Sequence, residues 1–466
     1  MIARILYFVF LLVLMSNTSL FAQDTLRISY SDFVEQALNN SGQLDYEQQN
    51  VKLAKNRVDM AKSQRILPSM KFSSQHGLVP AVKSDSTLPW GEPLPRDEYY
   101  LDPNLRNDWE DWGVFNRFEV SAAQPLFTWG AINTAIEAAR LGAESARYSF
   151  QAKKADLETK LFELYFSYVL AMEVERLLDE AQNKIDDITK ELDKALEEGD
   201  QDIDGADIYK FEIFKSEFDI QKQEVAGNME FIRETWNYVL RNDEGIIYEP
   251  ETRFLDPLAT KIEPVDFYHQ SALNNRPELK ALRKGAEATR TYISSLKKKN
   301  LPGLFLGGYI KYANTPNRPR QDNPFIQNTT NLFTGGFGLS IRMNLNFFSI
   351  RASLERSRIE LRKVSYAQEA AQDGILLDLY DKYRKAVLAD TKVEKTDEAL
   401  VTSKKWLREE QLDFDIGMGD VKDYVDALKK ELELKLKLKQ NTFELNKSLA
   451  RLNKAAGLPL NTLITN

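Results

Sequence analysis

The chain has 466 residues, 43% of them hydrophobic and 28% charged, and its formal net charge at pH 7 is −8. An acidic chain lacks the basic surface that nucleic-acid binding normally requires, so no nucleic-acid partner is expected. The chain contains no cysteine, which excludes disulfides, thiolate metal sites and cysteine nucleophiles.

The first 22 residues are typical of a secretory signal peptide. Arg4 provides a basic start, residues 5–15 form an apolar core, and cleavage is expected after Ala22. No cysteine follows, so we expect no N-terminal lipid anchor. Beyond this segment no run of 18 apolar residues occurs, so no helix is expected to span a bilayer. A mature chain embedded in a membrane would therefore have to use strands.

The first half of the mature chain is predicted to begin with two helices and two strands. Helices are expected at 32–40 and 43–65. Apolar and polar residues alternate at 70–75 and again at 117–122, which predicts strands with one apolar and one polar face. The proline-containing segment 76–113 between these strands is predicted to be a long, exposed, irregular loop.

Long helices follow these strands. From about Trp129 to Gly199 the apolar residues recur at spacings of three and four, which is typical of a coiled-coil seam. A further helix is expected from Asp204 to Arg241, before a proline-containing linker at 250–264. At ~1.5 Å per residue the two shorter helices together nearly match the long one. This favours two short helices in tandem beside the long one, with the linker as a belt at their junction.

The second half shows the same order of elements. Strands are predicted at 304–312 and 333–346, again from strict alternation. A helix is then expected after Ser349, with Ser349 as its N-cap, up to about Ile416. The last helix is predicted to end at Gly457 with a proline behind it.

The two halves therefore read as an internal repeat. Ala-Leu-Asn-Asn at 37–40 is echoed at 272–275. We expect a first repeat over residues 23–249, a second over 265–457, and a C-terminal tail at 458–466.

Four strands in one chain cannot form a closed membrane barrel. An open sheet in lipid would leave its edge N–H and C=O groups unpaired, and bacterial barrels have at least eight strands. Several chains would then each contribute a sheet. Small polar residues such as Gly336, Gly338 and Ser340 would line a lumen, and the opposite faces would contact lipid.

Several short motifs occur in a fixed order in the two halves. They are Ala-Leu-Asn-Asn at 37–40 and 272–275, Ile-Leu-Pro at 66–68, Leu-Pro at 301–302, Pro-Leu-Phe at 125–127, and glycine–aspartate turns near 199–207 and 417–426. In this order the chain resembles the outer-membrane efflux protein family typified by TolC, over essentially the whole mature length. The resemblance implies a mainly α fold with β: a homotrimer with a 12-stranded β-barrel in the cell outer membrane, in contact with lipid, and a long coiled-coil α-helical barrel in the periplasm.

The resemblance implies a transport function without chemistry of its own. The chain would be the exit duct of a tripartite efflux or type I secretion system, with a periplasmic adaptor (membrane fusion protein) and an inner-membrane pump as partners. No cofactor and no enzymatic activity are expected, since the two histidines lie in different halves and no common catalytic motif occurs. The alternative is a secreted coiled-coil scaffold or adhesin without a pore, which gives no reason for strands with separate lipid and lumen faces.

The turn at 417–420 and the helix after it form the first candidate site. Asp423 and Asp426 are three residues apart on one helix face, and the resemblance places the family's constricting aspartates at these positions. Three copies would form two acidic rings at a periplasmic aperture. Alternatively, both are ordinary charges at a helix N-terminus. Where the family's type member carries an arginine that helps hold the mouth shut, this chain has Gly419, so closure would use other contacts.

Two further sets of residues complete the candidate sites. The resemblance implies adaptor docking at the helical tips, at Gly199, Asp202, Ile203, Gly417, Gly419, Asp420 and Val421; the glycines also suit tight turns. Strand alternation and the resemblance together place on the lumen side Arg117, Glu119 and Arg342. These three would tune the charge of permeant solutes, or they form an ordinary solvated face.

Overall fold

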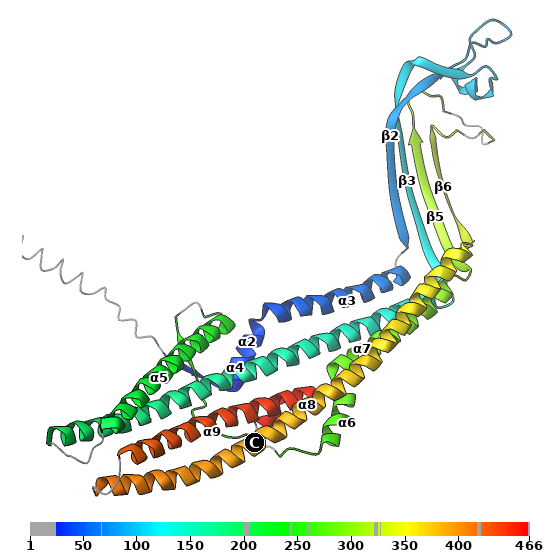
Figure 1. Cartoon of the computed structure of the whole chain (residues 1–466). Helices are drawn as coiled ribbons and strands as arrows, with labels where there is room; N and C mark the ends of the chain where they lie inside the picture. Colours follow the sequence, from blue (N-terminus) through cyan, green and yellow to red (C-terminus); the bar gives the residue numbers. More distant parts are fainter. Residues whose placement is uncertain are drawn as a thin grey trace, which may run out of the picture. The chain divides into compact units, whose positions relative to one another are not determined.

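A computed structural model describes residues 25–66, 68–198, 205–242, 245–259, 261–320, 325–326, 328–416 and 421–464. The expected signal peptide at 1–22 lies outside these residues. The described chain is mostly helical with some strands, as predicted (Figure 1). It divides into two compact units. Within the described residues, the first comprises the chain up to Gln49, Tyr148–Lys280 and the chain from Glu369, and the second comprises Asn50–Arg147 and Ala281–Gln368.

The elements follow the predicted order. In the first half they are β1 (Thr25–Ile28), α2 (Tyr30–Asn39), α3 (Gly42–Ile66), β2 (Ser69–Lys83), the 3-10 helix η1 (Arg96–Leu101), β3 (Arg106–Phe127), α4 (Ala131–Glu198), α5 (Gly205–Leu240) and β4 (Ile247–Pro250). In the second half they are α6 (Val265–Asn275), α7 (Pro277–Lys299), β5 (Gly303–Asn314), β6 (Leu332–Arg342), α8 (Phe347–Asp415), α9 (Val421–Ala455) and η2 (Leu460–Leu463). No helix in the described part of the chain is long and apolar enough to cross a bilayer.

The strands β2 and β3 extend much further than predicted. The segment 76–113 is not one irregular loop, because its two ends pair as an antiparallel ribbon out to Lys83 opposite Arg106. The register shifts between Pro80 and Ala81. Proline cannot donate a ladder hydrogen bond, and such an irregularity is where a strand tolerates it. The connection between the strands is therefore limited to residues 84–105.

Asp102 organises this connection. Its carboxylate accepts hydrogen bonds from the hydroxyls of Ser84 and Ser86 and from the backbone N–H of Asn104. The bond from Ser84 contributes most to lowering the pKa of Asp102 below its usual value. A carboxylate that closes several local hydrogen bonds fixes a turn without an apolar core.

Two helix starts differ from the prediction. Helix α8 begins at Phe347, because the side chain of Asn346 accepts a hydrogen bond from the backbone N–H of Ser349 at 3.3 Å. Asn346 is thus the N-cap, and Ser349 already lies in the first turn. Helix α2 likewise begins earlier than predicted, at Tyr30, since Ser29 accepts from the N–H of Asp32 at 3.2 Å.

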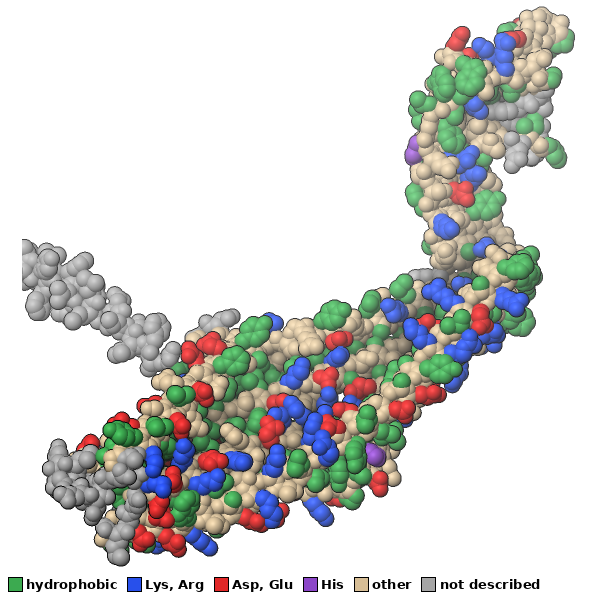
Figure 2. All heavy atoms as spheres, in the orientation of Figure 1, with side chains coloured by type: hydrophobic (Ala, Val, Ile, Leu, Met, Phe, Trp, Pro, Cys, Tyr) green, Lys and Arg blue, Asp and Glu red, His purple; other side chains and the backbone are tan. Residues whose placement is uncertain are grey.

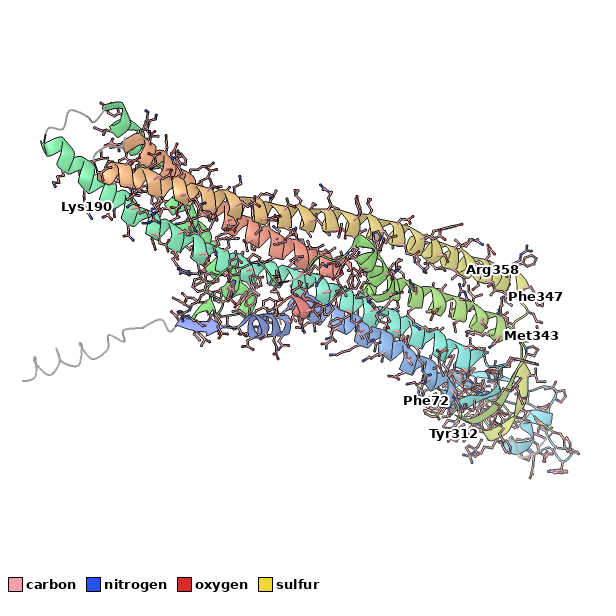
Figure 3. The ribbon with its side chains drawn as sticks, turned by 90° about the horizontal axis from the view of Figure 1, so that it is seen from below. Phe72, Lys190, Tyr312, Met343, Phe347 and Arg358 are labelled. Carbon is pink, nitrogen blue, oxygen red and sulfur yellow. The ribbon has the colours of Figure 1, made fainter. Side chains whose placement is uncertain are left out.

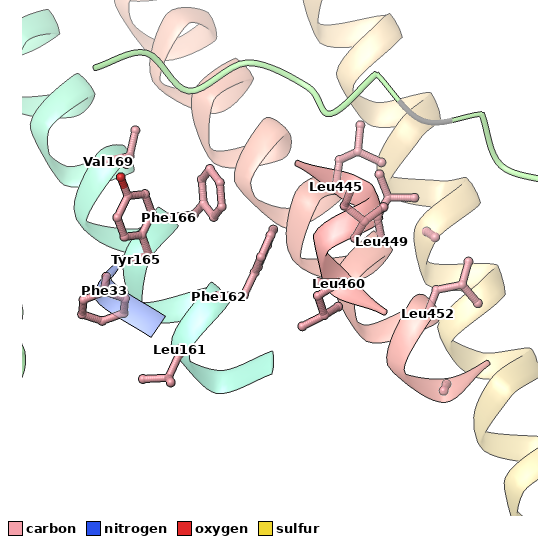
Figure 4. Close-up of a cluster of buried hydrophobic side chains, with 14 of the residues drawn as sticks. Phe33, Leu161, Phe162, Tyr165, Phe166, Val169, Leu445, Leu449, Leu452 and Leu460 are labelled. Carbon is pink, nitrogen blue, oxygen red and sulfur yellow. The ribbon is translucent and has the colours of Figure 1, made fainter. Parts of the chain in front are cut away.

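The first unit has two clusters of buried apolar side chains. The larger one joins α2, α4, α5, α6 and the parts of α8 and α9 that belong to this unit. Figure 4 shows the part of it between α4 and α9. Phe33 is fully buried and stacks on Trp236 at a ring distance of 4.2 Å. The smaller cluster packs α4, α5 and α9 close to the helix ends, with Leu178, Phe218 and Leu428 among its buried residues. The predicted coiled-coil seam of α4 thus supplies residues to both clusters.

A segment that we call the belt (residues 251–259) is held by side chains of α4 and α9 through its backbone. Arg176 donates to the carbonyl oxygen of residue 253 at 3.2 Å, and Lys439 donates to that of residue 255 at 3.1 Å. Asn446, which is fully buried, accepts from the N–H of residue 258 at 3.0 Å and donates to the carbonyl of residue 256 at 2.9 Å. Buried Glu173 contacts both Arg176 (3.1 Å) and Lys439 (2.5 Å). The belt therefore ties α4 to α9.

A short parallel pair that the sequence did not predict lies next to the belt. Strand β1 pairs with β4, from Thr25 opposite Ile247 to Ile28 opposite Pro250. The hydroxyl of Tyr165 on α4 donates to the carbonyl of Ile28 at 3.2 Å. The start of the described chain is thereby attached to the same segment that leads into the belt.

In the second unit, the beginning of α4 packs against α7. Ser145 donates to the carbonyl of Ala281 at 2.8 Å, and Ser295 donates to that of Ala131 at 2.9 Å. Small side chains at these points allow the helices to approach closely. The two helices lead directly from β3 and into β5, so their packing fixes where these strands begin and end.

Candidate functional site

The second unit contains a four-stranded antiparallel sheet in the order β2-β3-β5-β6. Directly opposed residues share a face, and the register carries one face across all four strands. Ser73 opposes Glu119, Glu119 opposes Lys311, and Lys311 opposes Thr334. The neighbouring residues form the other face in the same way. The sheet therefore has one continuous polar face and one continuous apolar face.

The apolar face is exposed over its whole width. Its side chains include Met70, Phe72, Phe118, Val120, Leu306, Ile310, Tyr312, Phe333, Phe337, Leu339 and Ile341. Phe337 is 91% exposed and Phe72 68% exposed. Phe118 stacks with both Phe72 and Tyr312 at ring distances of 6.4 Å, which forms an aromatic row across three strands. The two outer residues of this row, Phe72 and Tyr312, are labelled in Figure 3. A contiguous exposed apolar surface of this kind marks a face that contacts lipid or another apolar partner.

A histidine on the apolar face has its polar atoms satisfied by two neighbours. His76 lies 2.6 Å through Nε2 from the hydroxyl of Ser74 and 2.6 Å through Nδ1 from Oδ1 of Asn116. Its ring also meets that of Phe118 edge-on at 5.3 Å. This pairing reduces the cost of placing polar groups on an apolar surface.

The polar face holds every charged side chain of the sheet apart from the part of the β2–β3 ribbon that extends beyond the other two strands. They are Lys71, Arg117, Glu119, Lys311 and Arg342. Arg342 packs over the ring of Phe305 at 5.2 Å, and Arg117 over that of Phe115 at 5.1 Å. The structure thus brings together on one face the three residues singled out in the sequence. Lys71 and Lys311 were missed, although alternation within their own strands already placed them beside polar neighbours.

The strands carry fewer charges than the helices. On the side of the molecule shown in Figure 2, Lys, Arg, Asp and Glu side chains crowd the helices and are sparse over the strands. Where the β2–β3 ribbon extends beyond the other two strands, charges reappear in pairs. Lys83 lies 3.0 Å from Asp108, and Arg106 contacts Asp85.

The loop after β5 packs on the polar side of this ribbon. With its amide oriented to satisfy both groups, Asn317 accepts hydrogen bonds from the backbone N–H of Gly113 (2.7 Å) and of Ala81 (3.2 Å). Arg318 donates to the carbonyl of Pro80 at 2.9 Å. A Cβ atom on Gly113 would overlap the amide of Asn317. Glycine is therefore required here by the close approach of the loop.

A Gly113→Ala variant is expected to detach this loop, because the added methyl group occupies the place of the Asn317 amide. Overpacking of this kind costs about 1–3 kcal/mol, so we expect trypsin cleavage after Arg320 to become about tenfold faster, as local opening becomes easier. Gly77→Ala is the matched control, since its Cβ would meet nothing within 4 Å. Equal cleavage of the two variants would show that Asn317 does not hold the loop.

The second candidate site lies at the start of α9. Asp423 and Asp426 are exposed, whereas Tyr424 and Val425 between them are buried in the smaller cluster. Tyr424 stacks on Phe414 of α8 at 5.4 Å. The packing therefore turns the two carboxylates away from the core and toward solvent, and neither forms an ion pair with a described residue.

The structure places only part of the expected docking surface. Val421 is 8% exposed and belongs to the buried cluster. Gly199, Asp202, Ile203, Gly417, Gly419 and Asp420 lie outside the described residues. Among the described residues no group of three or more His, Asp or Glu side chains is placed to hold a metal ion.

Comparison with known proteins finds matches to the fold of this chain but none to its sequence. No protein-family model matches the sequence, and a comparison with curated proteins finds no match. Solved structures match over most of the chain. The CmeC outer membrane channel of Campylobacter jejuni covers 94% of this chain and is covered over 88% of its own length, with a TM-score of 0.70 and 15% identity.

Two other solved structures give the same result. CusC, described as forming a transmembrane channel, matches over 93% of each chain with a TM-score of 0.70 and 13% identity. The MtrE outer membrane channel of Neisseria gonorrhoeae, in an open state, matches over 92% of this chain and 89% of its own, with a TM-score of 0.67 and 15% identity. The resemblance found in the sequence is thus confirmed at the level of the fold, and the chain has the fold of these channels.

Proposed function

We propose that the protein is an outer-membrane channel that serves as the exit duct of a tripartite efflux or type I secretion system. The observation that carries this proposal is the sheet with an exposed apolar face and a polar face that holds all the charges. A sheet that separates lipid from water needs this division, since lipid-facing and lumen-facing residues alternate along each strand. A soluble scaffold has no use for an exposed row of aromatic rings.

The open edges of the sheet support assembly with further copies. In the described chain β2 and β6 each pair on one side only. In lipid the unpaired edge groups would cost several kcal/mol each, so the sheet has to close. Three copies placed edge to edge would give a barrel of 12 strands, in contact with outer-membrane lipid.

Exposed apolar side chains along the helices support the same assembly. On α8 they include Leu377 (73% exposed), Tyr380 (55%), Leu388 (48%) and Val401 (49%), at helical spacings. Such a stripe is typical of helices that pack against a partner. In a homotrimer it would pack against the neighbouring chain, and the helices would form a periplasmic barrel.

The proposed organisation follows the duplication read in the sequence. A signal peptide at 1–22 would direct export, two repeats at 23–249 and 265–457 would each supply two strands and the helices beside them, and the linker at 250–264 would lie between them. The tail would be 458–466. A periplasmic adaptor docking at the helical tips and an inner-membrane pump would complete the system.

In this arrangement Asp423 and Asp426 would form two acidic rings at the periplasmic aperture. Both carboxylates are exposed at the start of α9, and threefold symmetry would place six of them around the axis. Rings of carboxylates attract cations and raise the barrier to anions.

Single-channel conductance in planar bilayers tests this proposal. We expect the assembled trimer to form pores, and an Asp423→Asn/Asp426→Asn variant to lose cation permeability relative to the native protein at 0.1 M salt, where screening is weak. If pores appear and the variant behaves like the native protein, the duct stands and the acidic rings do not. If assembled oligomer gives no pore, a secreted scaffold becomes the better account.

A further inference from the structure

We propose that the strand section of this duct has a positive internal field and favours the passage of anionic solutes. The inference rests on the duct proposed above and adds to it the charge preference of its strand section. It comes from the register of the four strands, because the register decides which charges share the polar face.

The polar face holds four cations and one carboxylate, a net charge of +3 per chain. The cations are Lys71, Arg117, Lys311 and Arg342, and the carboxylate is Glu119. The whole chain has a net charge of −8, so the sheet differs in sign from the rest of the protein. Because no charge lies on the apolar face of this region, the excess positive charge is directed to one side only.

Most of these cations are not neutralised by neighbours. Lys71, Lys311 and Arg342 have no carboxylate within 4.0 Å among the described residues. Glu119 stands opposite Lys311 in the register, so it offsets one charge at most. Beyond the four-stranded region the cations of the ribbon are paired, as between Lys83 and Asp108 at 3.0 Å. The unpaired cations are therefore confined to the section proposed to enclose the lumen.

The cations also follow one another along the strands. In the register, Lys71 stands opposite residue 121 of β3 and Lys311 stands opposite residue 119. Arg117 lies on β3 itself, two residues beyond residue 119. At ~3.4 Å per residue these positions are about 7 Å apart, which is less than the Debye length of roughly 10 Å at 0.1 M salt. The fields of these three cations therefore overlap and form a continuous positive zone, and Arg342, opposite Gly303 at the other end of β5, adds a separate positive charge on the same face. Walls of one charge sign concentrate the opposite ion in the space between them.

Arg117 is held in place by the loop that follows β5. Its Nη2 donates to the carbonyl of Thr329 at 3.4 Å, while its Nε is buried without a hydrogen-bond partner. We therefore leave Arg117 unchanged in the test and alter the other three cations.

The test is the reversal potential of reconstituted trimer in a KCl gradient centred on 0.1 M. It compares native protein with a Lys71→Gln/Lys311→Gln/Arg342→Gln variant. We expect the chloride-to-potassium permeability ratio to fall roughly threefold or more in the variant, and the difference to shrink at 1 M salt, where the Debye length is about 3 Å. The Lys71→Arg/Lys311→Arg/Arg342→Lys variant keeps every charge and should retain the native ratio.

The comparison is repeated in the Asp423→Asn/Asp426→Asn background, which removes any contribution of acidic rings at the aperture. A fall in the ratio in both backgrounds supports the positive zone. An unchanged ratio in pores of normal conductance overturns it and leaves the duct intact. Absence of pores from correctly assembled native trimer overturns the duct and, with it, this inference.

Discussion

A Phe337→Arg variant is expected to fail to assemble in the outer membrane. Phe337 stands in the middle of β6 on the apolar face and is 91% exposed in the single chain, so a guanidinium there would enter the hydrocarbon of the proposed barrel. Arginine near the bilayer midplane costs about 2–4 kcal/mol, and a trimer incurs this cost three times. We expect the carbonate-resistant membrane fraction and the heat-modifiable trimer band on gels to be largely lost.

The neighbouring position provides a control with the same new side chain. Gly338 lies on the opposite face, and a Cβ atom there would meet nothing within 4 Å. Gly338→Arg should therefore assemble normally, with the added charge in the lumen. Equal assembly of the two variants would show that the two faces do not separate lipid from water.

A Gly457→Val variant is expected to lose about 4 kcal/mol of folding free energy, through backbone strain and a backbone clash together. Gly457 follows α9 with φ = +69°, a left-handed conformation that β-branched residues rarely adopt. The N–H of Leu458 donates to the carbonyl of Asn453 at 2.8 Å, which closes the helix end. A Cβ atom would stand 2.8 Å from the backbone nitrogen of Arg276 and 2.9 Å from the carbonyl carbon of Asn275.

Thermal unfolding followed by circular dichroism at 222 nm measures this loss as a lower unfolding temperature. Gly227→Val on α5 is the control, since Gly227 has no positive φ and a Cβ atom there would meet nothing within 4 Å. Valine and glycine differ by only a few tenths of a kcal/mol in helix propensity, so this control should unfold close to the native temperature. Similar losses in both variants would contradict the special role of Gly457.

The sequence was sufficient for the elements with a long and regular period. Alternation over residues 333–346 predicted β6 and both of its faces, although the strand ends at Arg342, since Asn344 accepts a hydrogen bond from the backbone N–H of Asn346 and turns the chain toward α8. The three-and-four spacing predicted α4 to within two residues at either end. The stop at Gly457 was predicted correctly as well, because glycine followed by proline is a strong local signal. In each of these cases the residues themselves carry the structural information.

The remaining features depend on partners that are distant in the chain. The ends of β2 and β3 contain Pro80 and several acidic residues, which favour a loop locally, and only their mutual pairing makes them strands. The four-residue strands β1 and β4 are too short to show a period. For the candidate site, alternation identified Arg117, Glu119 and Arg342, but Lys71 and Lys311 join them only through the register between strands.

The belt has a consequence for how this protein can diverge during evolution. The side chains of Arg176, Lys439 and Asn446 form hydrogen bonds with backbone carbonyl and N–H groups of the belt, and these groups do not depend on the side chain at each position. Most belt side chains can therefore be exchanged without loss of these bonds, provided that Leu255, which is 1% exposed, stays apolar. We expect natural substitutions to accumulate in the belt, whereas Arg176 on α4 and Lys439 and Asn446 on α9 should be retained.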